Sequence, residues 1–430
     1  MKKALIVTTI LLLLNFNTSF TYAENLNIDA ESCILIDSET GQVLYEQNAN
    51  ARLYPASTTK IITGALAIEY GELDQMMEAS QAAVYDIGKD GMNIGIMPGE
   101  ILCMKDLLGA LLVRSANETA NIIAENICTT RQEFVDLMNQ KAQELGAINT
   151  HFVNPCGAHD SNHYSTASDI AKIARYAMTL PEFREIVRMT EYSMSPTNKH
   201  SEWDTILYTT NHLLTRKTSD LFDITGMKTG YTDPAGHCLV SSAVNKDGVE
   251  LIAVVLGVKN PNSKENVLVY SEQLLEYGYK NYSMQEIAIP HEVVQFNIPV
   301  IGGEEGATVN LITENGLKAL LPVDKSKWNI TQEKNISSLI KAPVINGEIY
   351  GQIIYKSNDL VLGKVNIIAD KTVEVISDES TKDAIENSTV SSTFRRVAIG
   401  ACILILCFLL LRTFLRIVSR RVNSRKYKKY

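Results

Sequence analysis

The sequence predicts an α/β domain, followed by a small all-β domain and a C-terminal membrane helix. Three observations lead to this prediction. Strand-like runs lie near both ends of residues 24–283 with helical patterns between them, short β-type runs fill residues 284–376, and residues 395–418 are strongly apolar. Because strands at both ends of the first region enclose its helices, we expect one sheet to join its beginning to its end.

Hairpin patterns mark both ends of residues 24–283. Two apolar runs flank the turn sequence SETG, and CLVSSAV and VELIAVVLGV flank NKDG. From Ser57 to about Glu191 the spacing of apolar residues is helical. Thr166 and Asp169 predict a capping box before a helix, whose buried stripe would be Ile170, Ile173, Ala174 and Ala177.

The N-terminal residues 1–23 have the composition of a secretory signal peptide. Two lysines follow Met1, an apolar run extends from Ala4 to Leu14, and the segment ends in the small residue Ala23. An apolar run this short crosses a bilayer poorly, so we expect cleavage after Ala23. An uncleaved N-terminal anchor is the alternative.

The C-terminal end of the chain has the pattern of a membrane anchor. Polar residues 377–394 predict a flexible stalk, and residues 395–418 contain an unbroken apolar run, Val397–Leu411. The basic tail, residues 419–430, should stay in the cytoplasm by the positive-inside rule, with everything before the helix outside. A helix that lies on the membrane surface is the alternative, and the all-β domain could merely space the first domain from the bilayer.

Charge and cysteine usage exclude several function classes. All 49 acidic residues but only 28 of the 40 basic residues lie between Glu24 and Phe394, which argues against a nucleic-acid partner. The cysteines are widely spaced without a CxxC pair, and the histidines form no ligand pattern. We therefore expect no disulfide framework, no metal and no cofactor.

The stretch YPASTTKIIT places Lys60 three residues after Ser57. On a helix these two side chains share a face, and Pro55 just ahead suits a helix start. A serine hydroxyl needs a base to become a nucleophile, and a desolvated lysine loses its proton readily enough to serve. A lone Ser-x-x-Lys is usually chance, with the lysine stem lying along apolar surface.

Two further motifs strengthen the interpretation that Ser57 and Lys60 are catalytic. Ser115-Ala116-Asn117 interrupts a helical pattern, and Lys228-Thr229-Gly230 leads into apparent β structure. Each is weak alone, because Ser-x-Asn is common and Lys-Thr-Gly could be a turn. A serine–lysine pair followed by Ser-x-Asn and Lys-Thr-Gly is the set shared by class A β-lactamases and penicillin-binding proteins.

With these motifs, the chain resembles the serine-type D-alanyl-D-alanine carboxypeptidases, low-molecular-mass penicillin-binding proteins of the bacterial cell wall. The resemblance also covers GMNIGIMPGE, HYSTASDIA and TGMKTGYTDPAGHCLV, and it extends over nearly the whole exported part. It implies a β-lactamase/transpeptidase-like fold, an antiparallel sheet flanked by helices, for residues 24–283. Glu118, Cys156 and Ala158 depart from the residues that the family more often has, which puts substrate preference in doubt more than activity.

The resemblance implies acyl transfer from a peptide that ends in D-alanyl-D-alanine. Ser57 would attack the penultimate carbonyl, and Lys60 would take its proton. Ser115 would relay a proton to the leaving amine, and Asn117 would contact Lys60 and the substrate amide. Water would then hydrolyse the acyl-enzyme.

The third motif would hold the substrate. By the same resemblance, Lys228 and Thr229 would bind the terminal carboxylate. Gly230 would let the peptide approach the backbone closely, and the backbone N–H groups of Ser57 and Tyr231 would form the oxyanion hole.

The expected partners are peptidoglycan stem peptides ending in D-Ala-D-Ala, β-lactam antibiotics and the bacterial cytoplasmic membrane, on whose outer face the protein would be anchored. Two other functions stay open: a catalytically silent peptidoglycan-binding protein, and a β-lactamase or cross-linking transpeptidase. The additional glutamate of class A β-lactamases has no counterpart in the expected setting. Glu118 and Asn121 have its spacing but lie too early, and Glu182 and Glu185 lack the asparagine.

Overall fold

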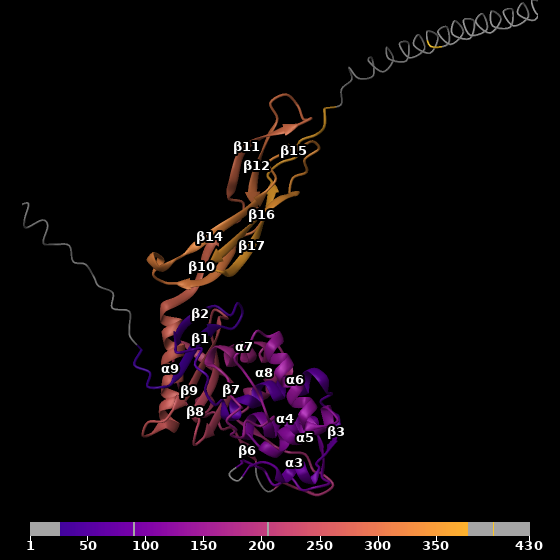
Figure 1. The fold of residues 1–430 in the computed structure, drawn as a ribbon. Coiled ribbons are helices and arrows are strands. Elements are labelled where there is room, and N and C mark those ends of the chain that lie inside the picture. Colours follow the sequence, from indigo (N-terminus) through magenta and orange to yellow (C-terminus); the bar gives the residue numbers. More distant parts are fainter. Residues whose placement is uncertain (1–25, 89–90, 204–205, 377–398, 400–430) are drawn as a thin grey trace, which may run out of the picture. The chain divides into compact units, whose positions relative to one another are not determined.

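The computed structural model describes residues 26–88, 91–203, 206–376 and 399. They pack as two compact units (Figure 1). Unit 1 contains the chain up to Ile287 with Leu317–Gln332 and Tyr355–Gly363, and unit 2 contains Ala288–Gly316, Glu333–Ile354 and the chain from Lys364.

Several predicted segments lie outside the described residues. These are the signal peptide, the stalk, the basic tail and, except for Ile399, the apolar run of the membrane helix. Within the described part of the chain, no helix is long and apolar enough to cross a membrane. The predicted domain boundaries and the membrane helix therefore stay predictions.

A five-stranded antiparallel sheet forms the centre of unit 1, in the order β2-β1-β9-β8-β7. The first strand of the described chain pairs with β9, so both predicted hairpins enter one sheet and the sequence prediction is confirmed. The strands are β1 (Ser32–Asp37), β2 (Val43–Gln47), β7 (Phe222–Thr232), β8 (Gly236–Asn245) and β9 (Glu250–Val258).

Helices cover both faces of this sheet (Figure 1). Alternating side chains of β1 enter two cores: Ile34 and Ile36 pack with most of the helices, whereas Cys33 and Leu35 pack with α9. The helical elements are η1 (Ala56–Thr59), α2 (Lys60–Tyr70), α3 (Gln81–Tyr85), α4 (Met104–Gly109), η2 (Ala110–Arg114), α5 (Asn117–Ile127), α6 (Arg131–Glu144), α7 (Ala167–Ala177), α8 (Pro181–Val187), η3 (His212–Leu214) and α9 (Ser263–Asn281).

Short strands also occur inside the stretch predicted as helical and directly after it. They pair as β3 (Met76–Glu78) with β4 (Ile101–Cys103), and β5 (Glu191–Tyr192) with β6 (Leu207–Tyr208). Runs of two or three residues are too short to show a period of their own, so local pattern could not predict them.

The predicted capping box before α7 is only half correct. The Thr166 hydroxyl accepts from the backbone N–H of Asp169 at 3.0 Å, as expected. The Asp169 carboxylate instead accepts from the N–H of Asn149 at 2.7 Å. A complete capping box joins Thr130 and Glu133 at the start of α6. Tertiary contacts of a buried carboxylate have here replaced the local one.

The described chain after α9 is built of strands with one short 3-10 turn, η4 (Lys325–Lys327), in agreement with the predicted β-rich region. A six-stranded sheet has the order β14-β16-β17-β12-β11-β15, and β10 (Tyr282–Ala288) pairs with β13 (Leu317–Pro322). The strands of the six-stranded sheet are β11 (Val293–Ile301), β12 (Thr308–Thr313), β14 (Ile330–Ile336), β15 (Ile340–Lys341), β16 (Ile349–Ser357) and β17 (Leu360–Ala369).

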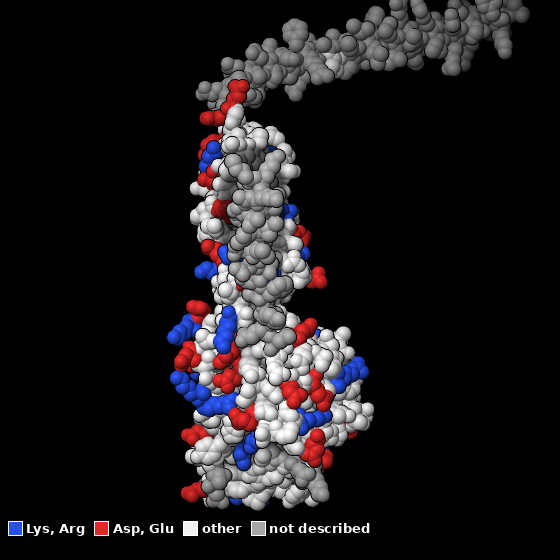
Figure 2. Space-filling model, turned by 90° about the vertical axis from the view of Figure 1, so that its left-hand side faces the viewer, with Lys and Arg blue, Asp and Glu red and all other residues white. Residues whose placement is uncertain are grey.

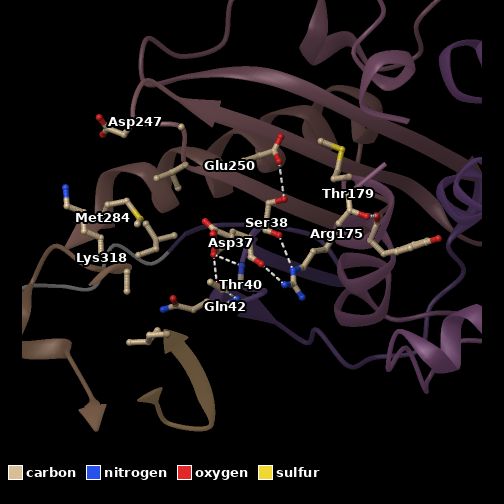
Figure 3. Close-up of a pocket in the computed structure, with 18 of the residues that line it drawn as sticks. Asp37, Ser38, Thr40, Gln42, Arg175, Thr179, Asp247, Glu250, Met284 and Lys318 are labelled. Atoms are coloured by element: carbon tan, nitrogen blue, oxygen red, sulfur yellow. Dashed lines mark hydrogen bonds between the residues drawn. The ribbon is translucent and has the colours of Figure 1, made fainter. Parts of the chain in front are cut away.

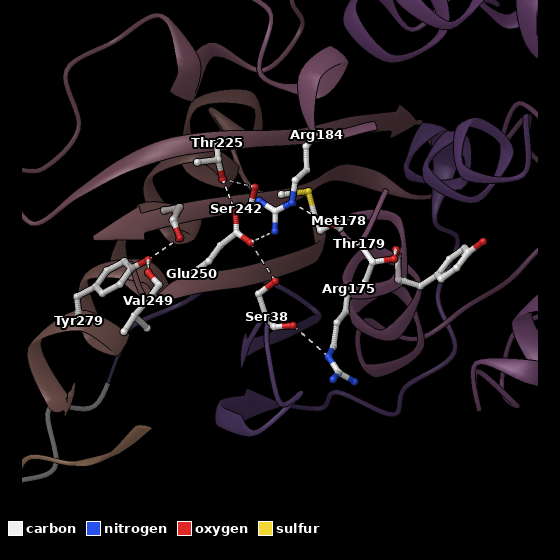
Figure 4. A network of polar contacts seen from close by, with 12 residues as sticks. Ser38, Arg175, Met178, Thr179, Arg184, Thr225, Ser242, Val249, Glu250 and Tyr279 are labelled. Atoms are coloured by element: carbon white, nitrogen blue, oxygen red, sulfur yellow. Dashed lines mark hydrogen bonds and ion pairs between the residues drawn. The ribbon is translucent and has the colours of Figure 1, made fainter. Parts of the chain in front are cut away.

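A pocket of about 750 Å³ lies in unit 1, and no predicted site residue lines it (Figure 3). One part of its wall is a polar network centred on Glu250 (Figure 4). Its carboxylate accepts from Arg184 at 2.9 and 2.6 Å, from the Ser38 hydroxyl at 3.1 Å and from the Thr225 hydroxyl at 3.2 Å. Through these hydrogen bonds, α8 and the β1–β2 turn are connected to β9. Thr225 connects β7 to the same carboxylate, three residues before Lys228.

Candidate active site

Lys60 is the centre of the site. It is the first residue of α2, and its side chain is completely buried. Its Nζ donates to Oγ of Ser57 at 2.8 Å, to Oδ1 of Asn117 at 2.7 Å and to the carbonyl oxygen of Cys156 at 2.6 Å. Three distant segments therefore meet at one ammonium, and its three protons all have acceptors.

The local backbone explains why Ser57 can reach Lys60. Ser57 lies in the 3-10 turn η1, directly before α2, so the expected common face spans two consecutive elements. Ala56 has a φ of +48°, which is unusual for a residue with a Cβ. Gly157 packs so closely on this turn that a Cβ would lie 1.9 Å from the carbonyl oxygen of Ala56.

Burial changes the chemistry of Lys60. Desolvation lowers the pKa of Lys60 to about 8, against the opposing effects of Cys156 and Glu118. An appreciable fraction of the amine is therefore unprotonated near neutral pH. Such an amine, 2.8 Å from a serine hydroxyl, can act as a general base.

The second motif lies at a break between two helices. The π-helical turn η2 ends at Arg114, the next residue Ser115 has a φ of +71°, and α5 begins at Asn117. π-helical turns are rare and are often found at functional sites. The break buries both side chains and leaves the Asn117 amide to accept from Lys60 and to donate to the carbonyl oxygen of Ile87 at 3.2 Å.

The third motif lies within β7, which resolves the choice between strand and turn. Lys228 is completely buried and its Nζ donates to the carbonyl oxygen of Thr229 at 2.9 Å. Burial, and secondly the charge of Lys60, hold the pKa of Lys228 well below its ordinary value. A Cβ on Gly230 would lie 3.0 Å from the backbone nitrogen of Ser57, so β7 passes close to η1. Tyr231 follows on the same strand and is half exposed.

Two residues of the site were missed from the sequence. Oγ1 of Thr229 donates to Oγ1 of Thr210 at 2.6 Å, so a second hydroxyl lies beside the predicted carboxylate-binding group. His163 accepts at Nδ1 from the N–H of Val153 at 3.2 Å and therefore donates from Nε2 to Thr59 at 2.9 Å. Burial lowers the pKa of His163 to about 4, so it is neutral beside Lys60. The segment HYSTASDIA contains His163 and was its only signal in the sequence, whereas Thr210 had none.

The site differs in charge from the exposed surface of the protein. Acidic and basic side chains are interspersed on the face drawn in Figure 2, and the chain carries a net charge of −9. The two motif lysines, in contrast, are both fully buried, and the charge of Lys60 lowers the affinity of Lys228 for a proton. In the described part of the chain, no cluster of three or more histidine, cysteine or acidic side chains could hold a metal ion.

Comparison with known proteins agrees with this geometry. The family model for "D-alanyl-D-alanine carboxypeptidase" matches residues 19–260, and that for "Penicillin-binding protein 5, C-terminal domain" matches residues 282–375. D-alanyl-D-alanine carboxypeptidase DacF of Bacillus subtilis is 29% identical over 349 residues, which is 80% of this chain and 86% of that protein. DacA of Escherichia coli K12 is 28% identical over 367 residues, or 81% of each.

Solved structures show the same similarity. Penicillin-binding protein 5 of Haemophilus influenzae superposes with a TM-score of 0.62 at 27% identity, covering 81% of this chain and 98% of that one. PBP3 of Streptococcus pneumoniae, a peptidoglycan synthesis regulatory factor, superposes with a TM-score of 0.64 at 25% identity, covering 81% of this chain and 100% of that one.

Proposed function

The chain belongs to the D-alanyl-D-alanine carboxypeptidase family, and from this premise we propose that Ser57 carries out the reaction through an acyl-serine intermediate. The enzyme would remove the terminal D-alanine from peptidoglycan stem peptides. The observation that supports this most directly is the 2.8 Å hydrogen bond between Nζ of the buried Lys60 and Oγ of Ser57.

In the first half of the reaction, the unprotonated amine of Lys60 takes the Ser57 proton as Oγ attacks the penultimate carbonyl carbon. The developing oxyanion is met by the backbone N–H groups of Ser57 and Tyr231, each of which is worth about 10² to 10³ in rate. The C–N bond then breaks, a proton passes to the leaving amine by way of Ser115, and D-alanine departs.

Substrate binding depends on a carboxylate. Lys228 and Thr229 receive it, with the Thr210 hydroxyl beside them. A carboxylate that approaches restores the proton affinity of a buried lysine, since opposite charges in a low-dielectric site attract strongly. This local attraction offsets the acidic character of the surrounding protein.

In the second half, water attacks the acyl ester, Ser57 recovers its proton and the shortened peptide leaves. The slim D-alanyl ester leaves room for water beside Ser57, whereas the bulky penicilloyl ester leaves less. No glutamate with the setting used by class A β-lactamases was found in the sequence. Penicillin should therefore form a long-lived adduct.

The decisive experiment labels the purified protein with a fluorescent penicillin and locates the modified residue. Label on Ser57, loss of label in Ser57→Ala, and D-alanine release from a D-Ala-D-Ala peptide are expected. Full labelling of Ser57→Ala would refute the assignment. Rapid penicillin turnover without D-alanine release would instead favour a β-lactamase.

We further propose export and anchoring at the outer face of the bacterial cytoplasmic membrane by residues 395–418. The support is the contrast between the acidic body and the basic tail. Removing everything after Phe394 should release a soluble, active enzyme. A truncated protein that still sedimented with membranes would mean that the β-rich region binds them.

A further inference from the structure

Glu118 is a buried acid beside the active site that the proposed mechanism does not use. It follows Asn117 in the first turn of α5, and it is 1% exposed. Its Oε1 accepts from the backbone N–H of Ile94 at 2.6 Å. Among the residues that the structure describes, its buried Oε2 has no hydrogen-bond partner. A buried carboxylate with one unpaired oxygen destabilises the fold, so its presence points to a role in the site.

The hydrogen bond to Ile94 is one of several between the start of α5 and the segment before β4. The N–H of Asn117 donates to the carbonyl oxygen of Met92 at 2.7 Å, and its side-chain amide donates to that of Ile87. A Cβ on Gly91 would lie 2.8 Å from the Asn117 amide nitrogen. The nitrogen of the Asn117 amide is therefore held by this segment, while its oxygen accepts from Lys60. Glu118 holds the same segment two residues further on.

Charge provides a second link between Glu118 and the reaction. The negative charge of Glu118 raises the pKa of Lys60, although burial is the larger effect and lowers it. Burial in turn raises the pKa of Glu118, and the charge of Lys60 lowers it. Cys156 and His163, in the loop before α7, and Lys228 on β7 also act on Lys60 or feel its charge. Glu118 is the carboxylate in this group.

This charge matters most while Ser57 is attacking. At that moment Lys60 accepts a proton and becomes an ammonium in a buried site, where its charge also acts on the buried Lys228. A fixed carboxylate close by stabilises the ammonium as it forms, without any rearrangement.

We propose that Glu118 is a positioning residue for acylation: it holds residues 91–95 against α5 so that Asn117 stays aligned on Lys60, and its charge stabilises the ammonium that Lys60 becomes. This inference rests on the proposed roles of Ser57 and Lys60. Two substitutions separate its two parts. Glu118→Gln keeps an acceptor of the same length for the N–H of Ile94 and removes the charge. Glu118→Asp keeps the charge and shortens the reach.

The test measures the rate of acylation by a fluorescent penicillin from pH 6 to 9, on the full-length protein in detergent. For Glu118→Gln, the acid limb of the profile should move to lower pH by about 0.5 to 1 unit, and the plateau rate should fall roughly three- to tenfold, because the lysine is a weaker base. For Glu118→Asp, the limb should stay in place and only the plateau should fall.

Glu100→Gln is the matched control. Glu100 is also a fully buried acid that accepts a backbone N–H, that of Met97 at 2.8 Å, but its other partners are Thr197 and His200. The acid limb of the acylation profile of Glu100→Gln should coincide with that of the wild type. An unshifted limb in Glu118→Gln overturns the charge role, and a wild-type plateau in Glu118→Asp overturns the clamping role. If Glu118→Gln does not fold, Glu118→Asp alone decides, since wild-type rates in it refute the proposal. Labelling outside Ser57 would refute the mechanism itself, whatever these profiles show.

Discussion

Two regions of unit 1 bury charged groups in opposite ways. Lys60 and Lys228 are completely buried, and the acceptors of their hydrogen bonds are neutral hydroxyl, amide and carbonyl oxygens. Glu250, in contrast, receives a bidentate ion pair from Arg184 and two hydroxyl hydrogen bonds (Figure 4).

The difference distinguishes a structural role, that of Glu250, from a catalytic one, that of Lys60. A buried charge that is paired and hydrogen-bonded keeps its ionisation state, and so it can hold strands and helices together. A buried lysine with neutral partners loses its proton easily, which is what a general base requires. The first arrangement lines a pocket without motif residues, and the second contains all three motifs.

The largest effect should come from Lys60→Ala. Without its base, Ser57 is a weak nucleophile, so acylation by penicillin should slow by at least about 10². The protein should remain folded, because a buried group that is expensive to charge has been removed. Stopped-flow labelling and thermal unfolding of the same preparation test this, and a rate near that of the wild type would mean that another group is the base.

Arg184→Met should be the opposite case. It leaves the Glu250 carboxylate largely buried with only hydroxyl partners, and we expect a loss of about 1 to 3 kcal/mol in the free energy of unfolding, less than for a fully buried pair because Arg184 is half exposed. Urea denaturation measures it. Adding Glu250→Gln should restore part of the loss. A slowed acylation without loss of stability would show that this network acts on the site rather than on the fold.

The pH dependence of acylation should report Lys60. The reaction needs the unprotonated amine, whose pKa burial lowers to about 8. The rate should therefore fall about tenfold per unit as the pH drops below 8, and it should level off above that value. A profile that keeps rising to pH 10 would show that the amine keeps an ordinary pKa and that the site is wetter than described.

The smallest effect should come from an exposed ion pair. Lys217 and Asp220 lie 3.0 Å apart and both are largely exposed. Solvent screens such pairs, so Lys217→Ala should change neither the melting temperature nor the acylation rate measurably. A clear loss of stability would show that burial is not what distinguishes the Glu250 network.

Local pattern was enough for much of this protein. The apolar runs that flank the turn sequences SETG and NKDG predicted both hairpins of the sheet. The spacing of Ser57 and Lys60 predicted that their side chains would meet, and Thr166 was identified correctly as an N-cap. Each of these features depends on residues within a few positions of one another, where chain geometry leaves few choices.

The tertiary structure alone decided what surrounds the base. Asn117 and the carbonyl of Cys156 lie 57 and 96 residues from Lys60 in the chain, yet both accept from its ammonium, and local pattern predicted neither contact, although the family resemblance implied that of Asn117. The Thr210 hydroxyl beside Thr229 and the Glu118 carboxylate have no local signature either. Whether a lysine is solvated or stripped of water depends on how helices and strands pack around it, and that packing joins distant segments whose spacing in the sequence carries no periodic signal.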